Sequence, residues 1–247
     1  MALDKKTLDS AVIEAIYWWN RDEDYYHKYF SQIGNYHLNN EMMDFFTSKV
    51  FSSFLREYSI RRNLLPGYDN VKLYLEKIIE FGFFNNVNSG NLDIIDEISK
   101  KVKDGGIGAK KGTISLLSKT AFLVNPNQFS LYDSYAIKAL KKVVKTDDDL
   151  KDKKQKSYKD FITSFNYIID KNESQIDNTI EILNDFQGSP AEIYFKSNLD
   201  AFRRRVFDKY LWIIGNNYSP NSREINNSYY KEFYILGLDS KIPSINL

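Results

Sequence analysis

Apolar residues recur along most of this chain at the three- and four-residue spacing of an amphipathic α-helix. One helical face near the N-terminus consists of Leu8, Val12, Ala15, Ile16 and Trp19. A second face consists of Met42, Phe45, Phe46, Val50, Phe54 and Leu55. The same spacing predicts further helices over 69–81, 92–102, 113–124, 134–144, 158–169, 176–186 and 191–214. Alternation of period two is confined to 232–238, so we predict an all-α fold.

The most polar stretch of the chain, TDDDLKDKKQK at 146–156, interrupts this pattern. Dense charge of both signs without apolar periodicity is typical of an exposed loop or a frayed helix end. We therefore expect one helical unit over residues 1–247, either undivided or arranged in two lobes with the exposed loop near 146–156.

Composition excludes several kinds of chemistry. The chain has no cysteine, which removes disulfides, thiolate nucleophiles and the cysteine-containing zinc motifs. Its two histidines, His27 and His37, lie in a region without clustered carboxylates, and no G-x-S-x-G elbow occurs. We predict no metal, no cofactor and no Ser–His–Asp nucleophile.

The N-terminal region argues against secretion. Acidic residues interrupt its first apolar stretch, and no cleavage site of small residues follows. No run approaches the roughly 18 apolar residues that a membrane span needs. We expect a cytoplasmic protein with no membrane partner, and the sequence leaves its oligomeric state open.

Charge is distributed unevenly along a chain that is nearly neutral. The formal net charge is +1 and the isoelectric point is about 7.7, so the protein as a whole lacks the basic character of many nucleic-acid binders. Between positions 100 and 145, however, the only acids are Asp104 and Asp133. The lysines in this stretch are Lys100, Lys101, Lys103, Lys110, Lys111, Lys119, Lys138, Lys141, Lys142 and Lys145. Such a local basic face is able to hold a phosphate backbone.

The same stretch contains an ordered set of motifs. A glycine-rich run, D-G-G-I-G, is followed by a helical segment with S-K-T-A around Lys119. A turn at N-P-N separates this segment from a second helical segment that opens at Asp133. The pattern places Lys119 near the middle of the first helix and Asp133 at the N-cap of the second.

This order resembles the K-T-A and V-D-T-H pairing of the helix-hairpin-helix DNA glycosylase superfamily, and more closely its bacterial 8-oxoguanine DNA glycosylase-like branch. The resemblance implies a two-lobed helical bundle that flips a base out of DNA. In that superfamily the lysine attacks the sugar C1′ and the aspartate assists departure of the base, and these roles fall on Lys119 and Asp133. The glycine-rich run is similar to the hairpin whose backbone amides hold a phosphate. The DNA contacts expected on this basis are Gly106, Gly108, Lys110, Lys111 and Tyr135.

This sequence departs from the family pattern in three ways. In the family pattern G-V-G-x-K, the lysine position corresponds to Lys110 of this sequence. Lys110 is therefore an alternative to Lys119 as the nucleophile. The separation from Asp133 is 14 residues for Lys119 and 23 for Lys110, and neither is the usual one. Tyr135 replaces the family's histidine. The resemblance covers about 40 residues, with a second, fainter likeness in R-R-R-V-F-D-K-Y-L-W at 203–212.

The residue types suit base excision. Breaking an N-glycosidic bond creates positive charge on the sugar, which a carboxylate such as Asp133 stabilises. A lysine attacks only when neutral, and desolvation with neighbouring positive charge would lower the pKa of Lys119. We expect a DNA glycosylase, with or without lyase activity at abasic sites. The alternatives are a non-catalytic helical module that binds DNA or a protein, for example in phage defence, and a helical interaction protein unrelated to nucleic acid. The base excised is not specified by the sequence.

Overall fold

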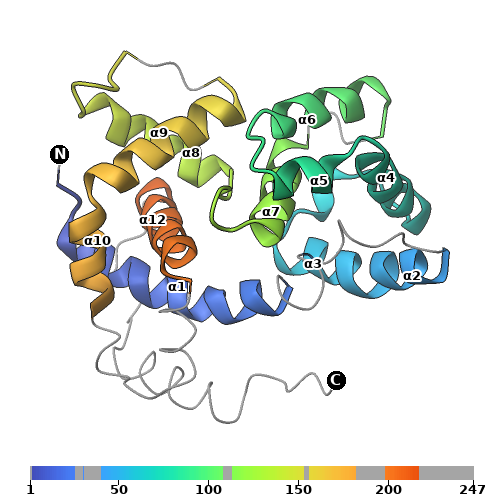
Figure 1. Cartoon of the computed structure of the whole chain (residues 1–247), viewed down its shortest axis with the longest axis horizontal. Coiled ribbons are helices and arrows are strands. Elements are labelled where there is room, and N and C mark those ends of the chain that lie inside the picture. The colour runs from blue at the N-terminus through green and yellow to red at the C-terminus, as the bar shows by residue number, and fades with distance from the viewer. Residues whose placement is uncertain are drawn as a thin grey trace, which may run out of the picture. The chain divides into compact units, whose positions relative to one another are not determined.

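A computed structural model of the chain describes residues 2–25, 30, 40–107, 113–152, 156–181 and 198–216 (Figure 1). The regular elements within these ranges are helices and no strand, which confirms the all-α prediction. The stretch 232–238 lies outside them. The longer helices are α1 (Lys5–Tyr25), α4 (Tyr68–Glu80), α6 (Ile94–Asp104), α7 (Ile114–Val124), α8 (Ser134–Lys145), α9 (Tyr158–Lys171), α10 (Glu173–Ile180) and α12 (Leu199–Gly215). The short elements are α2 (Asn40–Phe45), η2 (Phe46–Phe51), α3 (Ser52–Glu57), η3 (Arg61–Asn63) and α5 (Phe83–Asn88).

The chain divides into two compact units, each assembled from segments that are distant in the sequence. Unit 1 comprises Met1–Arg21, Ser134–Asp152 and Ser164–Leu247. Unit 2 comprises Asp22–Asp133 and Lys153–Thr163. One of the boundaries, between 152 and 153, falls within the stretch predicted as an exposed loop. None of the described helices is both long enough and apolar enough to cross a membrane.

An aromatic cluster fills part of the core of unit 2. The ring centroids of Phe51 and Phe54 lie 5.6 Å apart, those of Phe54 and Tyr58 5.0 Å, and those of Phe51 and Tyr74 6.2 Å. Phe51 ends the π-helical segment η2, which links α2 directly to α3. A π-helical turn is wider than an α-helical one, so the face predicted from 3.6-residue spacing is interrupted here.

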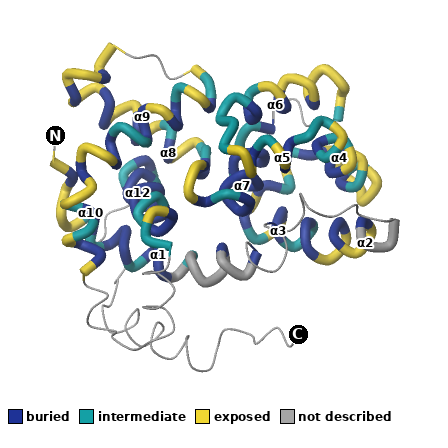
Figure 2. Tube along the Cα trace, viewed as in Figure 1, coloured by how far each residue is buried: buried dark blue, intermediate teal, exposed yellow. Residues whose placement is uncertain are grey.

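Helix α7 crosses unit 2 as a core helix. Eight of its residues are buried. Buried residues are dark blue along the trace of α7 in Figure 2. A helix that is apolar on nearly all sides packs against neighbours all round, and α5 and α6 are among those of α7. Lys119 is half-buried on this helix, so an amine is carried into an otherwise apolar environment.

The second segment of unit 2, Lys153–Thr163, is attached to the first segment through the start of α9. The carboxylate of Asp96 accepts hydrogen bonds from the backbone N–H groups of Tyr158 and Lys159, at 3.0 and 3.1 Å. These bonds satisfy donors that a helix N-terminus leaves unpaired. The fully buried Tyr158 hydroxyl donates to the Ser130 carbonyl at 3.0 Å and accepts from the Ser130 N–H at 3.1 Å.

Unit 1 is built around α12, which packs closely on α8. An ideal Cβ placed on Gly215 would lie 2.0 Å from the carbonyl oxygen of Tyr135, so only glycine allows this approach. The N-terminus joins the same unit, because the Leu3 N–H donates to Gln175 at 2.9 Å and the Asp4 N–H donates to the Tyr210 hydroxyl at 3.1 Å.

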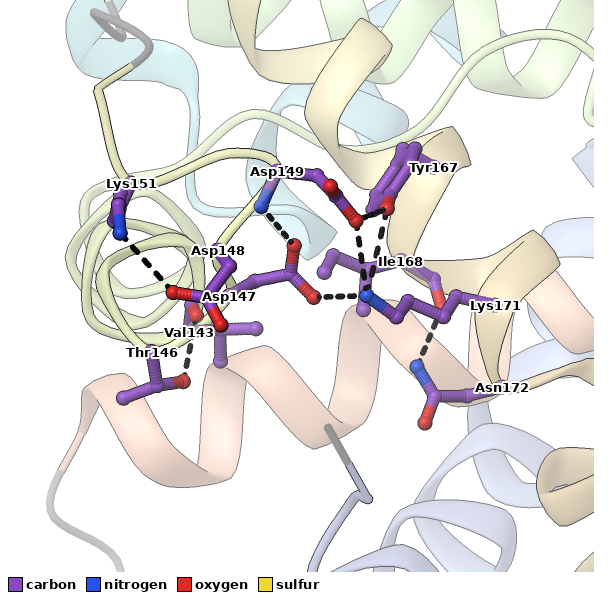
Figure 3. A network of polar contacts seen from close by, with 10 residues as sticks. All are labelled: Val143, Thr146, Asp147, Asp148, Asp149, Lys151, Tyr167, Ile168, Lys171 and Asn172. Carbon is purple, nitrogen blue, oxygen red and sulfur yellow. Dashed lines mark hydrogen bonds and ion pairs between the residues drawn. The ribbon is translucent and has the colours of Figure 1, made fainter.

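The polar stretch after α8 is more ordered than predicted. Thr146, at its start, is exposed, but the Asp147 side chain is 1% exposed and Leu150 is fully buried. Lys171 on α9 donates to Asp147 at 2.7 Å and to Asp149 at 3.3 Å, as Figure 3 shows. The prediction of exposure is therefore wrong for Asp147 and Leu150, because two ion pairs with Lys171 and the buried leucine attach the segment to the rest of unit 1.

Most predicted helices are present, with three differences. The prediction of one helix over 191–214 is wrong at Asn198, whose backbone angles of −138° and 50° are non-helical. Helix α12 begins at Leu199, and 191–197 lie outside the described residues. The prediction over 176–186 corresponds to α10, which begins earlier, and 182–186 lies outside the described residues. Helix α5 has no counterpart in the prediction, because its FFNNVN sequence is short and lies between Gly82 and Gly90.

Candidate functional site

Lys119 lies in the middle of α7, as predicted, and its amine has a specific partner. The Nζ atom donates a hydrogen bond to the backbone carbonyl of Tyr58 at 3.2 Å. Both residues belong to unit 2 although they are 61 positions apart. The lysine candidate is therefore held by an acceptor that no local sequence pattern indicates.

The Tyr58 carbonyl is available because α3 ends there. Ser59 adopts a left-handed conformation with a φ of 55°, and its N–H donates back to Arg56 at 3.1 Å. The Ile60 N–H donates to Leu55 at 2.9 Å, which completes a Schellman-type helix end. Carbonyls at a helix C-terminus lack helical donors and carry partial negative charge, so a lysine amine is a favourable partner. In this position Lys119 links α7 to the end of α3.

Asp133 immediately precedes α8, at the position predicted for an N-cap, and is half-buried. The residue before it is fixed to α7, because the Tyr132 N–H donates to the Ser118 hydroxyl at 3.1 Å. Ser118 and Tyr132 are the chain neighbours of Lys119 and Asp133. With standard backbone dimensions, this single bond limits the Cα–Cα distance between Lys119 and Asp133 to at most about 15 Å. The structure thus brings the two segments together within unit 2.

The glycine-rich run begins at the C-terminal end of α6. Gly106 has a φ of 67°, its N–H donates to Lys103 at 3.1 Å, and the Ile107 N–H donates to Val102 at 3.1 Å. Gly106 therefore ends α6 in a Schellman motif, where a left-handed residue is required. The other predicted DNA contacts in this run, Gly108, Lys110 and Lys111, lie outside the described residues.

Tyr135 belongs to unit 1 and is 41% exposed. Its ring meets that of Trp212 edge to face, with the centroids 6.0 Å apart. Trp212 is itself half-buried, and Lys209 lies with its Nζ 5.6 Å from the Trp212 ring centroid and 4.4 Å from that of Trp18. The exposed ring of Tyr135 on α8 is thus supported by a half-buried ring of α12, and the buried amine of Lys209 lies near that second ring.

Four lysines of the basic stretch gather on one helix. A shallow groove of about 520 Å³ follows α8 and is lined by Ser134, Ile137, Lys138, Lys141, Lys142 and Lys145. All four lysines are exposed. The sequence indicated the excess of lysine, but only the helix shows which members share a surface.

The arginines at 203–205 are engaged within unit 1. Arg203 bonds to Asp177 at 2.6 Å and to Asp200 at 2.8 Å. Arg205 is 1% exposed and donates to the buried Asp208 at 2.7 Å. Arg203 is therefore held in ion pairs, and the burial of Arg205 places its guanidinium in the core.

The described residues contain no group of three or more histidine, aspartate or glutamate side chains arranged to hold a metal ion. Comparison of the chain with protein-family models, with curated proteins and with solved structures gives no match.

Proposed function

We propose that this protein is a DNA glycosylase in which Lys119 is the nucleophile and Asp133 stabilises positive charge on the sugar. The observation that carries the proposal is the hydrogen bond from the Tyr132 N–H to Ser118, which holds the segments bearing the two groups against each other. The motif order of the sequence and a half-buried amine on an apolar helix support the same assignment.

The reaction requires the amine to change partner. Lys119 must leave the Tyr58 carbonyl and lose a proton before its nitrogen forms a bond to C1′ of an extruded nucleotide. The N-glycosidic bond breaks, and the base leaves with the electron pair and takes up a proton. The carboxylate of Asp133 stabilises the cationic sugar while this bond breaks. The C1′–O4′ bond of the sugar then breaks as the nitrogen forms a double bond to C1′, and O4′ takes up the proton that the nitrogen loses. The product is a ring-opened, protonated Schiff base, which borohydride reduces to a stable amine.

Borohydride trapping on duplex DNA tests the nucleophile. We expect a covalent adduct with the wild-type chain on an abasic site or on one member of a panel of damaged bases. Lys119→Arg should lose the adduct while its guanidinium still reaches the α3 carbonyl, since arginine stays protonated. Lys100→Arg on the exposed face of α6 is the matched control and should retain the adduct.

Three outcomes separate the alternatives for the amine. An adduct that persists in Lys119→Arg but disappears in Lys110→Arg would assign the nucleophile to Lys110. Base release without any adduct would indicate that water attacks, and Asp133→Asn should then slow release by about 100-fold or more. Neither adduct nor base release on any substrate would contradict the glycosylase proposal.

A second candidate function is a DNA-binding module without catalysis, of the kind that a phage-defence protein could use. The bond between Lys119 and the α3 carbonyl favours it, because it gives the lysine a structural purpose. Binding to duplex DNA that weakens with salt, together with no base release from the lesion panel, would favour this candidate over the enzyme.

A further inference from the structure

The positive charge on α8 is concentrated and uncompensated within the described part of the chain. The helix sequence SYAIKALKKVVK contains no acid, and Lys138, Lys141, Lys142 and Lys145 form no ion pair with any described residue. Lysines elsewhere do pair, for example Lys5 with Asp9, Lys77 with Glu80 and Lys159 with Asp93. Lys100 and Lys103 on α6 are also exposed and form no ion pair with a described residue, but α6 carries the acids Asp96 and Glu97 as well. Helix α8 differs because its four lysines share one helix that contains no acid.

The requirements of the fold explain only part of this arrangement. Like charges three or four residues apart on a helix repel one another. Lys142 and Lys145 lie in the last turn, where the helix dipole favours cations. Lys138 is the fifth residue of α8, nearer the N-terminal end, where the dipole offers a cation no such benefit. An external anion would offset the repulsion among all four.

An aromatic side chain extends the basic surface at its N-terminal end. Tyr135, Lys138, Lys142 and Lys145 follow one another at the three- and four-residue steps that place side chains on one helical face. Tyr135 is 41% exposed and is supported edge-on by Trp212. A supported ring beside a row of lysines combines the two elements that single-stranded nucleic acids recognise, namely cations for phosphates and a flat surface for a base.

We propose that the α8 groove binds single-stranded nucleic acid, with the backbone phosphates on Lys138, Lys141, Lys142 and Lys145 and one base stacked on Tyr135. The lysines extend over eight residues, from Lys138 to Lys145, or about 10 Å of helix. This length matches about three steps between successive phosphates at the rise of a duplex strand, so it accommodates about four phosphates. The groove lies in unit 1, whereas Lys119 and Asp133 lie in unit 2, so the proposal does not rest on glycosylase chemistry.

Fluorescence anisotropy with labelled oligothymidine DNA and oligouridine RNA of about ten nucleotides tests the groove. If the four lysines each neutralise one phosphate, the slope of log K against log salt should be about −2.8. Affinity should then fall roughly 50-fold between about 50 and about 200 mM salt. The DNA and RNA arms identify which nucleic acid binds more tightly.

Substitution of the lysines separates this groove from charge in general. Lys138→Gln/Lys141→Gln should make the slope shallower by about 1.4. Lys5→Gln/Lys77→Gln removes the same charge from α1 and α4 and should leave the slope unchanged. All of these side chains are at least partly exposed, and circular dichroism checks that each variant remains folded. An equal change in both double variants, or no binding by the wild type, would overturn the proposal.

Tyr135→Ala tests the stacked base. It should weaken binding of the oligonucleotides about 5-fold or more while leaving the affinity for inorganic polyphosphate, which has no base, unchanged. If Tyr135→Ala changes neither, or if polyphosphate competes with the same affinity per phosphate as the oligonucleotides, the groove is a general anion-attracting surface and the proposal fails.

Discussion

At the scale of single residues, the amine of Lys119 caps the C-terminal end of α3. The hydrogen bond to Tyr58 spans 3.2 Å and satisfies a carbonyl at the C-terminus of α3. Lys119→Met keeps the aliphatic stem but removes this donor, so we expect the free energy of unfolding to fall by about 1 kcal/mol. Urea denaturation measures the change. Lys119→Arg, which can still donate, should lose less than Lys119→Met, and an equal loss would contradict a role for the bond.

The Asp147–Lys171 pair makes a pH-dependent contribution to stability. Hydrogen bonding from Lys171 lowers the pKa of Asp147 below its ordinary value, and the same bond raises the pKa of Lys171. A carboxyl whose pKa is lowered on folding stabilises the protein above its unfolded pKa, and that stabilisation is lost as the pH falls. The pair therefore contributes fully near neutral pH and progressively less below about pH 4.

Asp147→Asn isolates this contribution. We expect the variant to have a lower Tm than the wild type at about pH 7, and the difference between the two should shrink by about pH 3. Other carboxyls with lowered pKa values, such as Asp4 and Asp160, titrate in both proteins and cancel in the comparison. A difference in Tm that is constant over this range, measured by thermal scans in matched buffers, would argue against the ion pair as its cause.

Sequence patterns predicted the positions of Lys119 and Asp133 because both depend on neighbouring residues. Apolar periodicity sets the middle of α7, and an aspartate before a helical run is a common N-cap. The partner of Lys119 is 61 residues away, and no periodicity encodes such a contact. The same reason explains why the ring support of Tyr135 by Trp212, between α8 and α12, could not be predicted.

At the scale of elements, the contact between α8 and α12 depends on one glycine. A Cβ on Gly215 would lie 2.0 Å from the Tyr135 carbonyl oxygen and 2.5 Å from its carbonyl carbon. Both atoms belong to the backbone and cannot move away without shifting α8. Gly215→Ala should therefore lower the free energy of unfolding by at least about 2 kcal/mol. At Gly105 a Cβ would come no closer than 3.3 Å to its neighbours. Gly105→Ala is the matched control, and an equal loss in both variants by urea denaturation would contradict the packing argument.

Helices with clear periodicity were the ones that the sequence predicted well, including α4, α6, α7 and α8. Two features lacked a local signal. The π-helical segment Phe46–Phe51 carries buried residues at a different spacing from an α-helix, so the pattern concealed it. Asn198 adopts non-helical angles before α12 although the residues around it favour a helix.

At the scale of the whole molecule, unit 2 is completed by a second segment, Lys153–Thr163, which follows a stretch of unit 1 in the sequence. Tyr158 on that segment is fully buried and forms two hydrogen bonds with the backbone of Ser130. Tyr158→Phe leaves a buried donor and a buried acceptor without this partner, which should cost about 2 kcal/mol. Amide hydrogen exchange should show faster exchange concentrated between positions 22 and 133. Equal acceleration in both units would indicate that they do not open separately.

The division into two units was not predictable from the polar stretch at 146–156 alone. A break in apolar periodicity marks a change in local structure, but it does not say which segments rejoin. Unit 1 combines three stretches of the chain and unit 2 combines two. These assignments depend on long-range contacts such as Asp96 with Tyr158, which span 62 residues.

The bonds that join the first residues of the chain to α10 and α12 have a consequence during synthesis. The hydrogen-bond partner of the Leu3 N–H is Gln175, and that of the Asp4 N–H is Tyr210, 206 positions later in the sequence. During synthesis these two backbone donors therefore have no such acceptor until residues 175 and 210 have been added to the chain.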